Sequence, residues 1–136
     1  MVQGSCFCGD FAYEMTGQPA AVVACHCLPC RKTSGTIGSI NLIVPDNQFK
    51  VTKGIPKLFV RKGDSGKNLT YHNCPICSVL LWAEGEALPG VKIVKIGSVD
   101  DLEWVEKLGA PKQEIYCKNM WGWEKGWEGA ERKEVS

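Results

Sequence analysis

The sequence predicts a mainly β domain of short antiparallel strands with little helix. Short apolar stretches are separated by turn residues along the whole chain, which has 15 Gly and 7 Pro in 136 residues. Many short strands with frequent Gly and Pro are typical of all-β domains. Only one stretch has the apolar spacing of a helix, and no internal repeat is visible.

The expected strands follow one another from the N-terminus. Residues 11–15 alternate apolar and polar side chains and precede a turn at 17–19. A short apolar run at 21–24 ends beside a group of cysteines, and the stretch 36–44 is rich in Ile, Val and Leu. Further strands are expected at 57–61, 69–72, 79–83 and 91–96.

A single helix is expected over residues 100–108, because Leu102, Val105 and Leu108 recur at threefold spacing. Domains of about 100–150 residues are the commonest size, so we expect one domain over residues 2–128. The mixed-charge residues 129–136 are expected to form a frayed tail.

The charge balance excludes a diffuse basic surface. The chain has 16 Lys and Arg against 15 Asp and Glu, whereas binders of nucleic acid or of anionic membranes are strongly basic. No apolar run approaches the ~20 residues of a membrane span, and the N-terminus lacks the pattern of a signal peptide. We therefore expect a cytoplasmic protein with no nucleic-acid or membrane partner; the oligomeric state is left open.

Seven of the eight cysteines lie in three tight clusters. These are a first pair (Cys6 and Cys8), a central trio (Cys25, Cys27 and Cys30) and a second pair (Cys74 and Cys77). Such short spacings let thiolates converge on one tetrahedral ion, whereas disulfides usually join distant segments and need an oxidising compartment. Metal binding is favoured over a disulfide scaffold, and zinc over an iron–sulfur cluster, because ferredoxin-type spacings are absent.

Seven clustered thiols divide into four and three. Structural zinc takes four protein ligands, whereas catalytic zinc takes three and keeps a position for water or substrate. We assign the central trio to an open site, because one hexapeptide supplies all three cysteines. The two pairs together would then form a closed site. His26 could instead close the second site, although a residue between two ligands points away from their metal if the backbone is extended.

Three motifs occur in a fixed order: GSCFCGDFAYEMTGQP, CHCLPCRKTSG and NCPICS. Together with the later IGSVDDL, they resemble the glutathione-dependent formaldehyde-activating enzyme family over most of residues 2–118. The resemblance implies a β-tent fold stapled by zinc, which small zinc-binding chaperones of guanine-nucleotide-binding proteins share. The chain departs from the family at Ser78, where Gly is usual, and at Asn73, where an aromatic residue is frequent.

The resemblance also implies a division of labour between two zinc ions per chain. The first and second pairs (Cys6, Cys8, Cys74 and Cys77) would hold a structural zinc, and the central trio (Cys25, Cys27 and Cys30) a catalytic one. The family reaction joins the co-substrate glutathione to formaldehyde, which gives S-hydroxymethylglutathione. We therefore expect a zinc-dependent carbon–sulfur lyase or synthase that acts on a glutathione-type thiol adduct, with the substrate thiolate on the open zinc.

Two other hypotheses fit the cysteines. One is a non-enzymatic zinc module that binds a partner protein, like the chaperone-type β-tent relatives, with its second zinc saturated by His26 or Cys117. The other is a redox sensor in which the central trio releases its metal on oxidation.

The residues around the trio suggest substrate contacts. Arg31 and Lys32 are candidates for binding the carboxylates of glutathione, although they could equally be solvated turn residues. Thr33 and Ser34 could donate to a developing alkoxide, but hydroxyls beside a Gly more often satisfy the backbone of a turn.

Two features of the C-terminal part remain. The segment 121–127 carries three of the five Trp residues and is expected either to pack on the sheet as a lid or to form an apolar wall over the open zinc. Such a wall would select a bulkier or aromatic adduct. Cys117, the eighth cysteine, is expected to be a small buried apolar residue.

Overall fold

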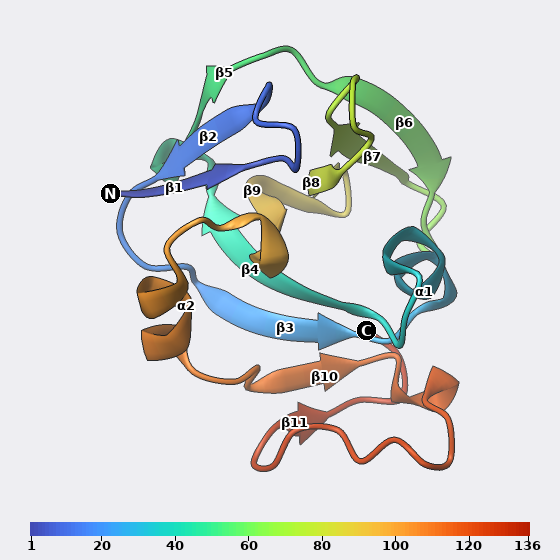
Figure 1. The fold of residues 1–136 in the computed structure, drawn as a ribbon. Helices are drawn as coiled ribbons and strands as arrows, with labels where there is room; N and C mark the ends of the chain where they lie inside the picture. The colour runs from blue at the N-terminus through green and yellow to red at the C-terminus, as the bar shows by residue number, and fades with distance from the viewer.

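A computed structural model describes residues 1–136 and confirms the mainly β class, with eleven strands and two short α-helices (Figure 1). The strands are β1 Val2–Ser5, β2 Ala12–Met15, β3 Ala21–Cys25, β4 Ser39–Pro45, β5 Phe49–Lys53, β6 Lys57–Lys62, β7 Asn68–Asn73, β8 Leu80–Gly85, β9 Leu88–Lys95, β10 Gln113–Ile115 and β11 Glu131–Arg132. The α-helices are α1 Leu28–Ser34 and α2 Leu102–Leu108, and single 3-10 turns occur at Asp46–Gln48, Ile96–Ser98 and Cys117–Asn119.

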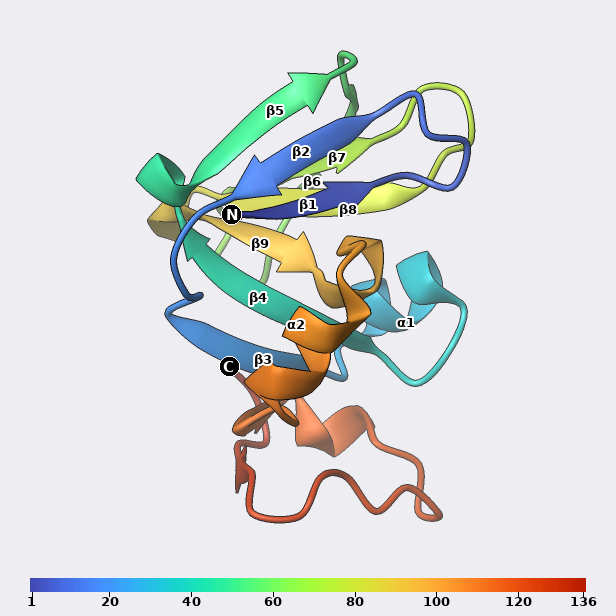
Figure 2. The ribbon, with the colours of Figure 1, turned by 60° about the vertical axis from the view of Figure 1, so that its left-hand side comes forward.

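The strands form two sheets. The small sheet has the order β1-β2-β5 and the large one the order β11-β10-β3-β4-β9-β8-β7-β6. Neighbours are antiparallel except that β10 runs parallel to both β3 and β11. Figure 2 shows the small sheet at one end of the molecule and the C-terminal residues at the other, with β3, β4 and β9 of the large sheet between them.

The core lies between the small sheet and one face of the large sheet. Its buried residues come from both sheets and the loops beside them: Val2, Cys6, Phe11, Tyr13, Met15, Leu42, Val44, Cys74, Leu81, Trp82, Val94 and Val99. The Tyr13 ring stacks on Phe49 at 4.9 Å between ring centroids, and its hydroxyl is hydrogen-bonded to Ser98 at 2.7 Å. Full burial of each large side chain stabilises the fold by about 1.5–3 kcal/mol.

Every strand expected from the sequence is present with shifted ends, and the expected helix is α2. The sequence did not predict β1, β5, β10 or β11, nor the helix α1. Val105 and Leu108 of α2 pack partly buried against the core as their spacing predicts, but Leu102 is 78% exposed and Trp104 packs against the core with them instead.

Helix α1 begins inside the central trio, which explains why it was missed. Cys27 is its N-cap, with a side chain that accepts a hydrogen bond from the Cys30 N–H, and Pro29 lies in the first turn. Gly35 adopts a left-handed conformation at φ 73° and ends the helix by donating its N–H to the Arg31 carbonyl. Neither this helix nor α2 is long and apolar enough to cross a membrane.

The end of the chain is not the frayed tail that we expected for residues 129–136. Strand β11 pairs with β10, and the N–H groups of Tyr116 and Cys117 donate to the carbonyls of Val135 and Lys133 at 3.1 and 3.0 Å. These backbone hydrogen bonds join the tail to the segment that follows β10, a pairing that composition alone does not reveal.

Candidate metal centres

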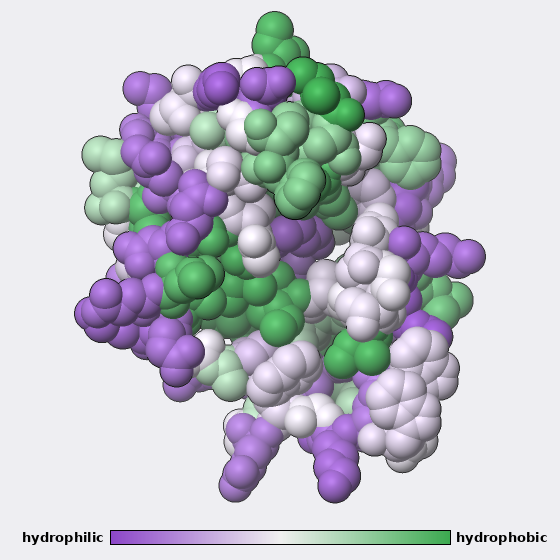
Figure 3. Space-filling view, viewed as in Figure 1, coloured by the Kyte–Doolittle hydropathy of each residue, from purple (hydrophilic) through white to green (hydrophobic).

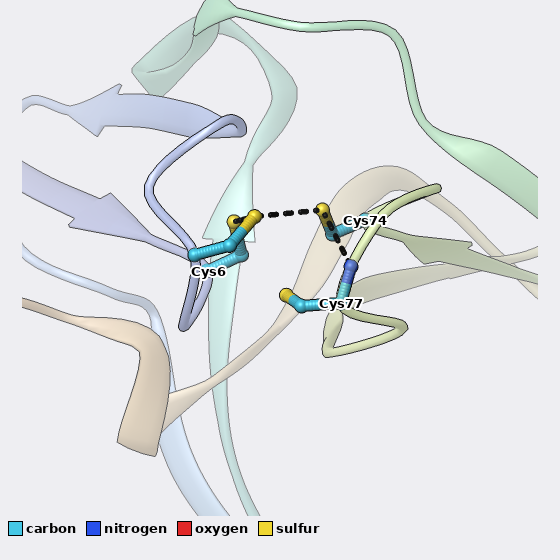
Figure 4. Close-up of side chains that lie close together, drawn as sticks. Cys6, Cys74 and Cys77 are labelled. Carbon is cyan, nitrogen blue, oxygen red and sulfur yellow. Dashed lines mark hydrogen bonds between the residues drawn. The ribbon is translucent and has the colours of Figure 1, made fainter.

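The first and second pairs of cysteines meet in space. The first pair follows β1 and the second follows β7, yet their four sulfur atoms lie within 4.8 Å of one another. Figure 4 shows the side chains of Cys6, Cys74 and Cys77 directed toward a common point. The sulfurs of Cys6 and Cys8 are 3.6 Å apart and those of Cys8 and Cys74 are 3.7 Å apart. A tetrahedral zinc with Zn–S bonds of about 2.3 Å holds its sulfurs about 3.8 Å apart, so these four fit zinc.

Backbone N–H groups around this closed group favour thiolates. The Phe11 N–H donates to the Cys6 sulfur at 3.3 Å, and the Ile76 N–H donates to the Cys74 sulfur at 3.4 Å. Hydrogen bonds from the backbone, chiefly that of Val79, lower the pKa of the Cys77 thiol to about 6. Against the backbone hydrogen bond from Asp10, burial and the other three sulfurs of the group raise the pKa of the Cys8 thiol to about 12, so four thiolates need a cation between them.

Ser78 occupies the position where the family usually has Gly, and its backbone is left-handed at φ 68°. Its N–H donates to the Cys74 carbonyl at 3.0 Å, which closes the turn beneath the second pair. A residue with a side chain adopts this conformation at a cost of about 1–2 kcal/mol, which explains the family's preference for Gly. The turn nonetheless keeps its shape in this chain.

The central trio is assembled by the end of β3 and the start of α1. Cys25 is the last residue of β3, and the first helical turn brings Cys27 and Cys30 together, so that all three sulfurs lie within 4.8 Å of one another. Gly38 is needed for this arrangement, because a Cβ atom there would lie 2.3 Å from the Cys25 carbonyl oxygen. The sequence predicted this grouping of sulfurs into four and three; the identity of the bound ions stays a prediction.

The three thiols of the trio cannot all ionise unaided. Hydrogen bonds from Cys25 and then Cys27 lower the pKa of the Cys30 thiol to about 2, with help from the Lys95 charge and the Ser39 hydroxyl. Hydrogen bonds with Cys27 and Cys30, together with burial, raise the pKa of the Cys25 thiol. One negative charge is thus shared among three sulfurs, and three full thiolates need a cation such as zinc between them.

Two cations that the sequence analysis missed lie near the trio. Lys95 donates to the Asn41 side chain at 2.7 Å, and the Asn41 amide donates to the Ser39 hydroxyl at 3.0 Å. Asn41 pairs with Lys95 across β4 and β9, while Ser39 pairs with Cys25 across β4 and β3, so these side chains share one face of the large sheet. Burial lowers the pKa of Lys95, and the trio's negative charge, mainly on Cys30, opposes that shift.

Arg61 is the second cation. Its Nε donates to the Tyr71 hydroxyl at 2.7 Å, and the negative charge on Cys27 and Cys30 contributes to a raised Arg61 pKa that burial opposes. No carboxylate lies within 4.0 Å of the Arg61 or Lys95 side-chain nitrogens. The sequence gives no local signal for these two residues, because they reach the trio only through the pairing of strands that lie far apart in the chain.

His26 and Cys117 do not join the trio. His26 is buried, and its Nε2 is hydrogen-bonded to Glu114 at 2.9 Å. Cys117 is half-buried, as befits a small apolar residue, and its sulfur donates to the Glu114 carbonyl at 3.5 Å. All eight cysteines are free, and no fourth His, Cys, Asp or Glu is grouped with the three sulfurs.

The residues of α1 that were expected to contact substrate make contacts within the protein, and their role toward substrate stays a prediction. The Arg31 guanidinium stacks 3.9 Å above the Trp121 ring and donates to the Asn119 carbonyl at 3.3 Å, and Lys32 is exposed. Thr33 donates to the Cys30 carbonyl at 3.2 Å, a bond within the helix. The Ser34 hydroxyl similarly accepts from the Thr36 N–H at 3.2 Å.

A cavity of about 720 Å³ lies beside α1 and the end of β3, but none of the three cysteines of the trio lines it. Figure 3 shows this face of the molecule hollowed between its central apolar area and the side on which α1 lies. The lining residues come from the ends of β3 and β9, from α1, and from the stretches 36–40 and 78–80, with Trp127 added from the C-terminal part. Neither Arg31 nor Lys32 contributes to the lining.

Comparison with known proteins identifies the fold and the motifs. The sequence profile described as "glutathione-dependent formaldehyde-activating enzyme" matches residues 1–119. The chain belongs to this family. The crystal structure of a Rhodobacter sphaeroides protein has a similar fold, with a TM-score of 0.61 and 18% sequence identity over 80% of this chain and 96% of that one. No curated protein matches the sequence. The family match ends at residue 119, before the Trp-rich segment.

We predict that the two centres contribute unequally to stability. Cys74→Ser removes a ligand that ties two distant segments together and should unfold the chain, whereas Cys27→Ser should release one zinc and leave the fold intact. Circular dichroism and elemental analysis of zinc per chain measure both effects. Equal loss of fold in the two variants would contradict a structural role for one centre and a functional role for the other.

Proposed function

We propose that the chain is a zinc-dependent carbon–sulfur lyase or synthase that forms and cleaves adducts between glutathione and an aldehyde. The observation that carries the proposal is the central trio, in which three sulfurs are gathered with no fourth protein ligand. Membership of the glutathione-dependent formaldehyde-activating enzyme family supports the same reaction class. The family reaction, with formaldehyde as the electrophile, is the starting point for assays.

The reaction needs a deprotonated sulfur held against a carbonyl carbon. In the synthase direction the glutathione sulfur bonds to that carbon, the π pair of the C=O bond moves to oxygen, and the proton that the thiol lost ends on that oxygen. The reverse step takes the proton from the hydroxyl, restores the C=O bond and returns the C–S pair to sulfur. Zinc, when held by the trio, would keep a thiol ligand deprotonated at neutral pH and accept the departing thiolate.

The charges around the trio suit an anionic substrate. Three thiolates and one divalent zinc sum to one negative charge, and Lys95 and Arg61 add two positive charges without carboxylate partners. These cations would therefore offset the charge of an incoming glutathione thiolate or bind one of its carboxylates. They are better placed for that role than Arg31, which already stacks on Trp121, or Lys32, which is exposed.

One observation favours a second candidate function, the non-enzymatic binding of a partner protein. Leu58, Phe59 and Val60 are more than half exposed on β6, the edge strand of the large sheet. An exposed apolar edge strand is a surface that another chain can cover. A partner-binding module would need no reaction at the trio, so the assay below separates the two proposals. Either role suits the cytoplasm, where reducing conditions keep the eight cysteines available.

We predict that the zinc-loaded protein accelerates exchange between free glutathione and S-hydroxymethylglutathione, measured by magnetisation-transfer NMR with ¹³C-formaldehyde. Cys27→Ser should reduce the enzymatic exchange rate at least a hundredfold, because it removes a ligand of the trio. Cys117→Ser is the matched control and should retain the rate, since Cys117 belongs to neither group of sulfurs. Exchange at the uncatalysed rate with the intact protein, for formaldehyde and larger aldehydes alike, would argue for the partner-binding module.

We further predict that Lys95→Met raises the KM for glutathione about tenfold, as expected when a charged hydrogen bond of ~1.5 kcal/mol is lost. Lys62→Met makes the same change in charge at an exposed position and should leave KM unchanged. Steady-state kinetics on the two variants measure the difference. An equal effect of both substitutions would mean that Lys95 acts only through the net charge of the chain.

A further inference from the structure

Tyr71 on β7 is buried, but it does not belong to the hydrophobic core. Its neighbour His72 stacks on Trp82 of the core at 4.4 Å between ring centroids. Because consecutive residues of a strand point to opposite faces of a sheet, the Tyr71 side chain points away from the core. Lys95 follows the core residue Val94 and points to the same face for the same reason. Tyr71 therefore shares the face of the large sheet that carries the cations near the trio.

The β6–β7 hairpin bends back toward the strand end that carries Cys25. Asp64, in the turn between β6 and β7, accepts a hydrogen bond from the Tyr116 hydroxyl at 2.7 Å. Tyr116 directly follows Ile115, which pairs with Cys25 across β10 and β3. Strand β6 is one edge of the large sheet and β10 lies beside the other edge, so the sheet is curved enough to bring the two together. Figure 1 shows β6 ending on the side of the molecule on which α1 lies.

Electrostatic effects between this hairpin and the trio agree with that path. Burial is the main cause of the raised pKa of Tyr71, and the negative charge on Cys30 and Cys27 adds to it against the hydrogen bond and charge of Arg61. Arg61 is affected by the charge of the same two sulfurs. Such effects weaken with distance, so the hairpin and the sulfurs of α1 are neighbours on this face.

The Tyr71 hydroxyl has one hydrogen bond within the protein, and it is the acceptor in that bond. The Arg61 Nε donates to it at 2.7 Å, and a guanidinium has no acceptor to offer in return. The proton of the hydroxyl therefore points away from Arg61. The Tyr71 ring stacks on Phe59 at 6.1 Å between centroids, which limits its movement. Because the pKa of Tyr71 is raised above its ordinary value near 10, the hydroxyl keeps this proton at neutral pH.

Other hydroxyls near the trio already have uses for their protons. The Ser39 hydroxyl interacts with the Cys30 sulfur and helps to lower the pKa of that thiol. The Tyr116 hydroxyl donates to Asp64, and the Thr33 hydroxyl donates to a carbonyl of its own helix. Tyr71 is thus a buried hydroxyl on the face of the trio whose proton is free for a substrate atom.

We infer that the Tyr71 hydroxyl donates the proton to the carbonyl oxygen in the synthase direction and that its phenolate removes this proton in the lyase direction. As the glutathione sulfur bonds to the carbon, the π pair moves to oxygen, and that oxygen takes the Tyr71 proton. The phenolate, stabilised by the Arg61 guanidinium, then regains from solvent the proton that the thiol lost. In the lyase direction the phenolate takes the hydroxyl proton, the C=O bond is restored, and the C–S pair returns to sulfur. The inference rests on the proposed function and adds the catalytic residue that transfers the proton.

Exchange kinetics of zinc-loaded Tyr71→Phe over a range of glutathione concentrations test the inference. We expect kcat to fall about a hundredfold or more, as is typical when a general acid is lost, while the KM for glutathione and the zinc content per chain stay unchanged. A hydroxyl that only stabilised the fold would not separate kcat from KM in this way. Tyr13→Phe is the matched control: it removes a buried hydroxyl of the core, hydrogen-bonded to Ser98, and should retain kcat. Arg61→Met keeps the Tyr71 hydroxyl but removes the cation that stabilises its phenolate, and should lower kcat about tenfold.

An unchanged kcat in Tyr71→Phe, with rapid exchange by the unmodified protein, would overturn the inference and leave the proposed function standing. An equal loss of kcat in Tyr71→Phe and Tyr13→Phe would also overturn it, because any buried hydroxyl would then have the same effect. Exchange at the uncatalysed rate with the unmodified protein would overturn the proposed function and the inference together. If Tyr71→Phe does not fold, Arg61→Met decides the matter, and an unchanged kcat in that variant would contradict the inference.

Discussion

Three thiols lie so close together in the central trio that they cannot all lose their protons without a cation among them, and the surrounding structure is organised around that constraint. The end of β3 and the first turn of α1 hold the sulfurs in place, and Gly38 lets the following strand pass close behind Cys25. Lys95 and Arg61 lie on the same side and bring positive charge. A divalent ion would offset most of the negative charge of the three thiolates and leave the site able to accept one more anionic sulfur.

The closed group of four sulfurs supports this site from a distance. It joins the loop after β1 to the turn between β7 and β8, and so fastens the small sheet to the large one beside the buried core. The core face of the large sheet packs against Phe11, Tyr13 and their neighbours, which leaves the opposite face to carry Ser39, Asn41 and Lys95. One sheet thus serves stability on one face and chemistry on the other.

Local patterns in the sequence predicted much of the fold and the cysteine grouping. Alternating and apolar runs located most of the strands, the threefold spacing of Leu102, Val105 and Leu108 located α2, and short cysteine spacings separated four sulfurs from three. Pairing between distant strands could not be predicted from local patterns. Strand β10 pairs in parallel with β3, which lies about ninety residues earlier, and Lys95 reaches the trio only through the register of β4 with β9. The pairing of β11 with β10 likewise overrode a composition typical of a frayed end. Helix α1 did have local signals, Pro29 and Gly35, but the cysteines around them were interpreted only as metal ligands.

The central claim is that the trio binds zinc and that this zinc accepts the sulfur of glutathione. Zinc-edge X-ray absorption with the selenol analogue of glutathione tests it directly, because a selenium atom bonded to zinc scatters differently from the seven cysteine sulfurs. The account predicts a selenium scatterer at bonding distance that is absent in Cys27→Ser and retained in Cys117→Ser. No selenium signal at saturating ligand, or zinc already bound by eight sulfurs before any ligand is added, would contradict it.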